Sequence, residues 1–214
     1  RYDAERSAPI TAFDADSRTV TIGTHSAAAV VWKSATRDGS TMNAEVTTRV
    51  PVDLALELGA VRADIQLGGL RLSALKLQTG ASELSLDVST PNSESLEVFN
   101  LDIGAADVEV RRGGNLHAAR VDVNVGVGKL DYDLDGNWEG TLAFDGTVAL
   151  GGLTLRVPSD VGLRVTAKTF LAGFKRAGLV RRGDSWYSPG YDDAKRRADV
   201  RVTTVFGGFE VIRR

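Results

Sequence analysis

A glycine recurs at nearly regular intervals through the middle of the chain, each time between two runs of alternating aliphatic residues. The repeated glycines are Gly59, Gly80, Gly104, Gly126 and Gly151, which lie 21, 24, 22 and 25 residues apart. A period of roughly 20–50 residues is typical of repeat proteins, in which each unit buries its apolar face only against its neighbours. This period constrains the fold more strongly than any other feature of the sequence.

Mostly apolar residues occupy the same positions relative to each of these glycines. Three residues before the glycine stand Leu56, Leu77, Leu101, Val123 and Val148. One residue before it stand Leu58, Thr79, Ile103, Val125 and Leu150. Four residues after the glycine stand Ala63, Leu84, Val108, Leu130 and Leu155. Six residues after it stand Ile65, Leu86, Val110, Tyr132 and Val157. Strict alternation indicates strands with one buried face.

Polar residues fill the intervening positions after the glycine, as a solvent-facing surface requires. They are Arg62, Glu83, Asp107, Lys129 and Thr154, and Asp64, Ser85, Glu109, Asp131 and Arg156. We therefore predict an all-β protein, a single-stranded β-helix in which each turn of about 21–25 residues contributes two short strands. Aliphatic side chains lie inside the predicted coil and charged side chains lie outside.

Composition limits the classes of protein to which the chain can belong. Its 214 residues make one large domain or two small ones, and no run approaches the ~18 consecutive apolar residues of a membrane-spanning helix. The chain begins at Arg1 rather than Met, which is typical of a fragment or a processed form. It has no cysteine, which excludes disulfides and thiolate nucleophiles. A net charge of −2 argues against a general nucleic-acid binder.

The repeat is irregular at both ends, and charge is distributed unevenly. We predict an N-terminal capping segment or small β subdomain at residues 1–50, and a solenoid at residues 51–214 with an irregular insertion or hairpin at 166–200. Residues 161–214 hold 12 Lys and Arg against 5 Asp and Glu, a balance of +7, and the remaining residues hold 14 against 23, a balance of −9. The basic segment is either a solvated strand edge or a contact surface for an anionic lipid or wall polymer.

Several segments resemble a known bacterial family. The segments LKLQTGASELSLDVS, VDVNVGVGKLDYDLDG, LTLRVPSDVGLRV and YDDAKRRADVRVTTVFGGFEVIRR are similar to the toast-rack group, which includes putative-adhesin domains and the C-terminal domains of Lia-type cell-wall-antibiotic response proteins. The resemblance covers about residues 50–214. It implies a flattened, two-sheet right-handed β-helix in an extracytoplasmic protein of the periplasm or cell surface, with a membrane-anchored parent protein as one option. It supplies no catalytic residues.

Asp131, Asp133 and Asp135 precede Gly136 in the order seen in the first half of a calcium-binding loop. A complete loop needs a glutamate at its twelfth position, and that position is Leu142 here. The alternative is that these aspartates form the solvent face of a strand that runs into a turn. We therefore predict no metal or cofactor site and keep the three aspartates as a calcium candidate.

Aromatic and basic residues gather in the predicted insertion. Arg181, Arg182, Trp186, Tyr187 and Tyr191 form a candidate interaction surface, because arginine beside aromatic rings makes cation–π contacts and stacks on sugars. The same residues could instead cover the open end of the coil. Sequence alone leaves both interpretations open.

These observations predict a non-catalytic structural or interaction module of the bacterial envelope, acting as a scaffold, as an adhesin or in envelope stress. The expected partner is a protein or a wall or surface polymer, with no nucleic acid, and a homo-oligomer stays open. Membrane association would require parts of the protein outside this chain. The alternative is a polysaccharide-active β-helix enzyme that uses the surface carboxylates of Asp107, Glu109, Asp131 and Asp133.

Overall fold

The computed structural model describes residues 7–26, 42–176 and 178–214, and it divides the chain into two compact units, Arg1–Val46 and Thr47–Arg214. In the described residues the regular structure consists of β-strands and one short 3₁₀ helix. The predicted all-β class is confirmed. The described ranges contain no helix that is long and apolar enough to cross a membrane.

The first unit contains one antiparallel hairpin, β1 (Ser7–Asp14) and β2 (Thr19–Ser26). The carboxylate of Asp14 accepts hydrogen bonds from the Ser17 hydroxyl and from the backbone N–H of Asp16 and of Ser17. These bonds close the turn between the strands and lower the pKa of Asp14. His25, one of the two histidines, lies in β2.

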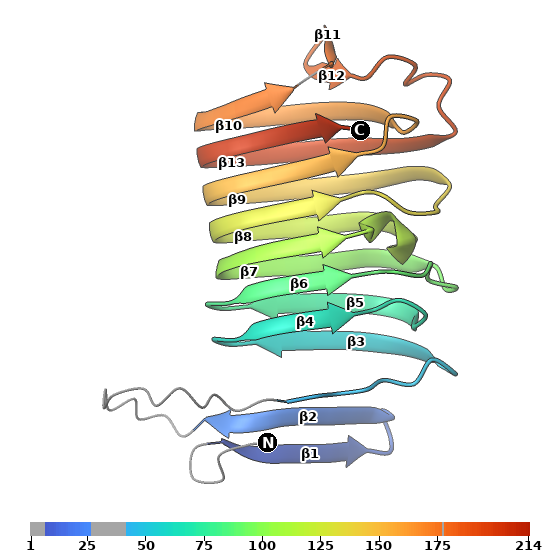
Figure 1. Ribbon diagram of the computed structural model, residues 1–214, viewed down its shortest axis with the longest axis vertical. Helices are drawn as coiled ribbons and strands as arrows, with labels where there is room; N and C mark the ends of the chain where they lie inside the picture. The colour runs from blue at the N-terminus through green and yellow to red at the C-terminus, as the bar shows by residue number, and fades with distance from the viewer. Residues whose placement is uncertain (1–6, 27–41, 177) are drawn as a thin grey trace. The chain divides into compact units, whose positions relative to one another are not determined.

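The second unit is a stack of layers, each of which follows the chain once around a flattened coil (Figure 1). The first two layers consist of strand pairs, β3 (Pro51–Leu58) with β4 (Arg62–Gln66), and β5 (Arg71–Thr79) with β6 (Glu83–Asp87). The next layers are single long strands that bend through both faces, β7 (Leu96–Arg111), β8 (Ala118–Asp133) and β9 (Gly140–Val157). Successive layers pair in parallel.

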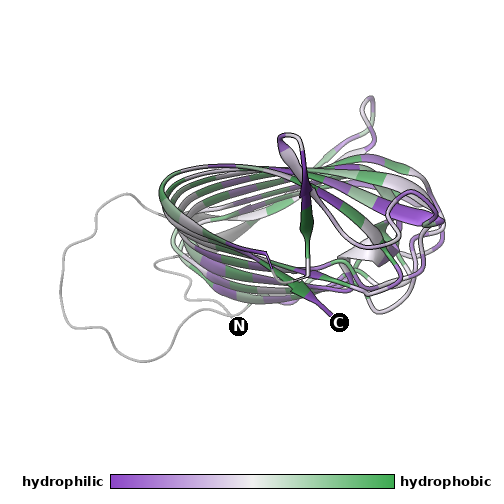
Figure 2. Cartoon of the chain, turned by 90° about the horizontal axis from the view of Figure 1, so that it is seen from above, coloured by the Kyte–Doolittle hydropathy of each residue, from purple (hydrophilic) through white to green (hydrophobic). Residues whose placement is uncertain are grey.

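The core lies inside this coil and consists of buried apolar side chains from both of its faces. Figure 2 shows the flattened coil from its end. The predicted columns are confirmed over the first four repeats, since Leu56 pairs with Leu77, Leu77 with Leu101 and Leu101 with Val123. Tyr132 and Phe144 are fully buried and meet edge to face, with ring centroids 5.3 Å apart. A continuous apolar column of this kind is what holds stacked layers together.

The prediction for the fifth repeat was wrong by two residues. Gly151 pairs with Gly128 rather than with Gly126, and Leu130 pairs with Leu153 rather than with Leu155. Gly128 and Gly151 have φ values of 128° and 138°, and a Cβ on Gly151 would collide with the carbonyl oxygen of Gly128. Only glycine fits where layers approach so closely at positive φ. Gly128, the second of the two glycines in β8, therefore sets the register between β8 and β9.

The end of the coil also differs from the prediction. The last strand, β13 (Arg196–Arg213), lies between β9 and β10 (Gly162–Arg176) and pairs with both in parallel (Figure 1). Gly207 of β13 stacks on Gly151, whereas β10 has Ala172 at that position. A Cβ in the position of Gly207 would collide with the Gly151 carbonyl oxygen, so β13 fits this layer and β10 does not.

The predicted irregular segment at 166–200 is therefore too long, because β10 continues to Arg176 and β13 begins at Arg196. The connection holds two short strands, β11 (Val180–Arg182) and β12 (Ser185–Tyr187).

The repeated glycines lie at one bend of the coil, which we refer to as the glycine bend. The turns on the opposite side of the coil carry buried asparagines. Asn92 follows β6, and Asn115 lies in the 3₁₀ helix η1 (Gly113–Leu116) between β7 and β8. The side chain of Asn92 bonds the backbone N–H and carbonyl of Leu72 and the carbonyl of Leu116, which lie in the neighbouring layers. These bonds replace strand pairing where the backbone leaves the sheet.

Candidate interaction surface

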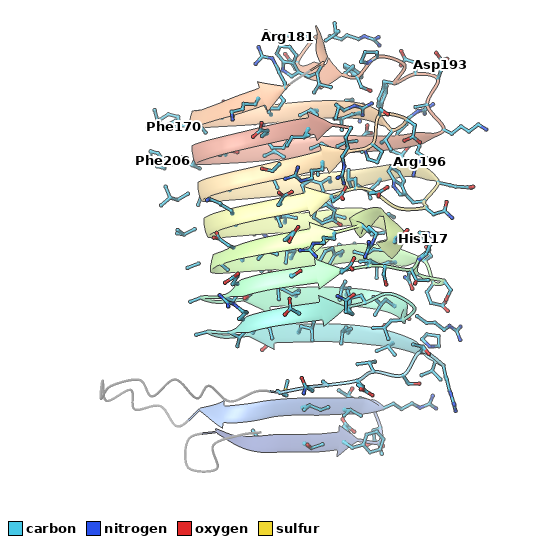
Figure 3. The ribbon with its side chains drawn as sticks, in the orientation of Figure 1. His117, Phe170, Arg181, Asp193, Arg196 and Phe206 are labelled. Atoms are coloured by element: carbon cyan, nitrogen blue, oxygen red, sulfur yellow. The ribbon has the colours of Figure 1, made fainter. Side chains whose placement is uncertain are left out.

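The predicted surface lies at the end of the stack, where β10 would otherwise present an open edge. β11 and β12 form a hairpin with Gly183 and Asp184 at its turn, and β12 pairs antiparallel with β10 at Arg164 and Val165. The Ser188 hydroxyl accepts a hydrogen bond of 2.9 Å from the Leu163 N–H, and Ser188 N–H donates to the Leu163 carbonyl. A parallel sheet thus ends in a short antiparallel cap (Figure 3).

Trp186 connects this cap to the core. It packs against the buried cluster together with Phe174, and the two ring centroids lie 6.4 Å apart. Phe174 in turn stacks on Phe209 with centroids 5.1 Å apart and planes within 4°. Aromatic side chains therefore cover apolar residues of the last layers, as one of the two sequence interpretations expected.

Two guanidinium groups lie over Trp186. The Cζ atom of Arg176 is 4.0 Å from a ring centroid of Trp186, and that of Arg181 is 5.9 Å away. Both side chains are exposed, and their hydrogen bonds go to backbone carbonyls, of Phe174 and Gly183 respectively. Within the described part of the chain neither arginine makes an ion pair. Their charge is therefore held in place and available to a ligand.

A second arginine–aromatic group adjoins the first. Arg182 lies 5.2 Å from the ring centroid of Tyr187 and forms an exposed ion pair of 2.9 Å with Asp192. Tyr187 meets Tyr191 edge to face at 5.1 Å, and Arg197 lies 5.8 Å from the Tyr191 ring. The structure thus brings together all five predicted residues and adds Arg176 and Arg197, which the sequence analysis did not select. We refer to these seven residues as the arginine–aromatic cap.

The hydroxyl of Tyr191 donates a hydrogen bond of 2.7 Å to the carboxylate of Asp199, which also pairs with Arg164. Burial and this hydrogen bond raise the pKa of Tyr191 to about 12. Since this value exceeds the ordinary value of 10.0, the unfolded state releases the phenol proton first. The stability contributed by protonated Tyr191 is therefore fully present below the unfolded-state pKa and is lost as the pH rises through the folded-state pKa.

We expect a smaller alkaline loss of stability in Tyr191→Phe than in the wild type across this pH window. Urea unfolding at a series of alkaline pH values measures the difference. Equal losses in the two proteins would show that Tyr191 does not link folding to proton release.

The calcium candidate residues are occupied by other partners. Asp131 accepts two hydrogen bonds from Arg156, at 2.8 and 2.5 Å, and Asp133 pairs with Arg214. The Asp135 side chain accepts a hydrogen bond from the backbone of Gly136. The described ranges contain no group of three or more acidic, histidine or cysteine residues that could hold a metal ion.

The second histidine, His117, ends η1 with a φ of 53°, and its Nε2 contacts the carbonyl of Asn137. It lies in the connection between β7 and β8.

The carboxylates of the enzymatic alternative lie on the outer face of the coil. Glu109 pairs with Arg111 at 2.6 Å, and this hydrogen bond lowers the pKa of Glu109. Asp107 lies opposite Lys129 in the strand register of β7 and β8. A general acid in glycoside hydrolysis needs a raised pKa. The residues predicted for that role show instead the pairing of a solvated charge ladder.

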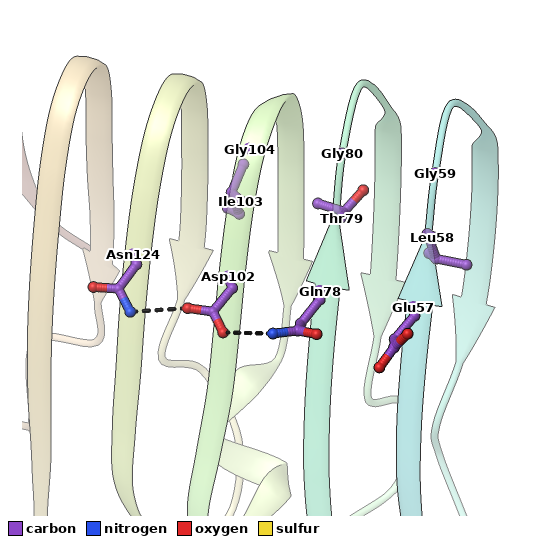
Figure 4. Close-up of a pocket in the computed structure, with 10 residues that line it drawn as sticks. All are labelled: Glu57, Leu58, Gly59, Gln78, Thr79, Gly80, Asp102, Ile103, Gly104 and Asn124. Atoms are coloured by element: carbon purple, nitrogen blue, oxygen red, sulfur yellow. Dashed lines mark hydrogen bonds between the residues drawn. The ribbon is translucent and has the colours of Figure 1, made fainter.

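A surface depression of about 510 Å³ lies at the glycine bend (Figure 4). On its wall, Gln78 and Asn124 each donate a hydrogen bond to Asp102, over 3.3 and 2.9 Å. The two amide donors therefore fix the carboxylate of Asp102. This arrangement connects three neighbouring layers, β5, β7 and β8.

An exposed apolar edge lies at the same bend, and the alternation of the sequence did not predict it. Leu150 was predicted to face inward, but its side chain is 50% exposed, and Phe206 is 45% exposed. The phase of alternation changes at the bend, and both residues of each adjacent apolar pair there are exposed. The sequence signal was available in Val205-Phe206 and Phe170-Leu171, where two large apolar residues interrupt the alternation.

Comparisons with known proteins agree with this architecture. No curated protein sequence matches the chain significantly. The crystal structure of a "putative cell adhesion protein" from Clostridium sporogenes ATCC 15579 is similar with a TM-score of 0.50 and 12% identity, over 96% of this chain and 76% of that chain. This likeness shows a shared fold. Residues 11–111 match the family model described as the N-terminal domain of toast_rack, DUF2154. Over residues 11–111, nearly half of its length, the chain therefore matches the toast-rack family.

Proposed function

We propose that this protein is a non-catalytic interaction module of the bacterial cell envelope, located in the periplasm or at the cell surface, and that its arginine–aromatic cap binds an anionic wall polymer. One observation carries the proposal: Arg176 and Arg181 are held against Trp186 without an acidic partner in the described residues. A guanidinium that stacks through its face keeps its N–H edge free for phosphate or carboxylate. The site therefore suits a ligand with repeated negative charge.

Charge distribution supports this ligand class. Residues 161–214 carry a balance of +7, whereas the rest of the chain carries −9. Clustered arginines raise the local concentration of an anionic polymer and hold it by several contacts at once. Aromatic rings between the arginines add surfaces on which sugar units can stack.

Three further observations support a non-catalytic, envelope role. The predicted catalytic carboxylates Glu109, Asp131 and Asp133 are paired with arginines. Residues 11–111 match the toast-rack family, and the similar solved structure is named as a "putative cell adhesion protein". We also infer a right-handed coil, because connections between parallel strands of one sheet are almost always right-handed. A rigid coil of this kind can present its end surface to a polymer.

The double variant Arg176→Gln/Arg181→Gln is expected to bind insoluble anionic wall polymer at least about tenfold more weakly than the wild type. Each lost contact between an arginine and an anion contributes on the order of 1 kcal/mol, so two such losses exceed one decade in affinity. Cosedimentation with purified phosphate-containing wall polymer measures this change, and increasing salt should weaken wild-type binding.

The matched control is Arg62→Gln/Arg111→Gln, which removes two exposed arginines that pair with Glu83 and Glu109 far from the cap. This control should bind like the wild type. Equal binding by the cap variant, or equal loss in the control, would contradict the proposal. Release of soluble sugar products during the assay would instead favour the enzymatic alternative.

A further inference from the structure

Five large apolar side chains protrude together from the bend of the coil, and we refer to them as the apolar edge. They are Phe170 (75% exposed), Leu171 (62%), Leu150 (50%), Val127 (49%) and Phe206 (45%). Isolated exposed apolar residues are ordinary on protein surfaces, but a contiguous group marks an interaction site.

Strand pairing makes this group contiguous. Val127 pairs with Leu150, Leu150 with Phe206, and Phe206 with Leu171, in four successive layers. With layers about 4.8 Å apart, this column is about 14 Å long. Phe170 precedes Leu171 and widens the edge at the end of the stack.

The apolar edge is convex. It follows the narrow bend at which each long strand passes from one face of the coil to the other (Figure 2), and Phe170 and Phe206 point outward from this bend (Figure 3). On one side it is bordered by Gly152, Gly208 and Gly173, which pair with one another and have no side chains. Two convex edges have little surface with which to contact each other. A protruding apolar edge can instead be buried by a deformable partner such as a lipid bilayer.

Within the four layers of the apolar edge, the charged residues of the two bordering columns are both lysines. In layers β8, β9, β13 and β10 the bordering column on one side consists of Asn124, Thr147, Thr203 and Lys168, and that on the other consists of Lys129, Gly152, Gly208 and Gly173. Neither column contains a carboxylate in these layers. Lys129 and Lys168 are exposed and make no ion pair with the described residues. A carboxylate-free border with two lysines is complementary to an anionic surface.

From shape, exposure and charge together, we infer that the apolar edge inserts into the interfacial region of an anionic lipid bilayer. The aromatic and aliphatic side chains enter the boundary between headgroups and acyl chains, and the two lysines contact lipid phosphates. This contact involves a different surface from the arginine–aromatic cap, and its readout does not depend on polymer binding.

Vesicle cosedimentation of the whole chain tests the inference. We expect binding to vesicles of phosphatidylglycerol and phosphatidylethanolamine, and weaker binding to vesicles of phosphatidylcholine alone. Phe170→Ser/Phe206→Ser should lower partitioning at least about tenfold, because it removes the two largest inserting groups. Lys129→Gln and Lys168→Gln should each lower it by about fivefold on the anionic vesicles only.

Phe13→Ser is the matched control, since Phe13 is 68% exposed but lies in β1, outside the apolar edge. It should partition like the wild type, and unchanged thermal unfolding should confirm that all variants fold. Absence of wild-type partitioning, or an equal loss in Phe13→Ser, would overturn the inference. Self-association that Phe170→Ser/Phe206→Ser abolishes, without vesicle binding, would overturn it by assigning the edge to a second copy.

Discussion

Gly151→Ala is expected to destabilise the coil by about 3–5 kcal/mol, a large part of the stability of an ordinary domain. Gly151 has a φ of 138°, which an alanine adopts only at a cost of about 1–3 kcal/mol. The added Cβ would also collide with the backbone carbonyl of Gly128 in the adjacent layer. Because the neighbouring group is backbone in a paired strand, relief requires separation of two layers. Urea or thermal unfolding measures the loss.

Gly173→Ala is the matched control for this substitution. Gly173 lies in the same bend, in β10, but its φ is not positive and a Cβ there would meet no atom within 4 Å. We expect a change within about 0.5 kcal/mol, or a small gain from the reduced entropy of the unfolded chain. A similar loss of stability in both variants would show that close approach of the layers is not the reason for the glycine column.

Asn92→Ala is expected to lower the free energy of unfolding by about 3 kcal/mol. Asn92 is 2% exposed, accepts a 2.9 Å hydrogen bond from the Leu72 N–H, and donates to the carbonyls of Leu72 and Leu116. Truncation leaves these buried backbone groups without their partner, at a cost of roughly 1–3 kcal/mol for each unsatisfied group. Chemical denaturation gives the difference in stability.

A matched asparagine lies on the outer face of the coil. Asn124 makes one side-chain hydrogen bond, to Asp102, and is exposed. Asn124→Ala should therefore cost less than about 1 kcal/mol. If Asn92→Ala were as mild as this control, water or a rearranged turn would be satisfying the Leu72 backbone, and the connecting role of Asn92 would be refuted.

The local part of the fold could be predicted because it depends on period and alternation. Leu56, Leu77, Leu101 and Val123 form one column in the structure because each stands at the same distance from a glycine. The prediction failed at Gly151, since β8 contains two candidate glycines, Gly126 and Gly128, and both preserve the alternation. Choosing between them requires knowledge of which glycine has positive φ against the next layer.

The candidate surfaces show the same division. Arg181, Arg182, Trp186, Tyr187 and Tyr191 are close in the sequence, and a short hairpin keeps them close in space. Arg176 and Arg197 join them through β10 and β13, which no local pattern connects. The apolar edge combines residues up to 79 positions apart, from Val127 to Phe206, so only strand pairing could bring them together.

By itself, the sequence determined that this protein is a stack of β layers with an apolar interior, because alternation and a glycine period are properties of neighbouring residues. Only the tertiary structure decided that β13 lies between β9 and β10, and hence which side chains share a layer. The physical reason is that layer order depends on how closely two backbones approach. Gly207 can lie against Gly151, whereas an alanine in its place would collide with the Gly151 carbonyl oxygen. This steric difference between β13 and β10 arises only where strands that are distant in the sequence come together.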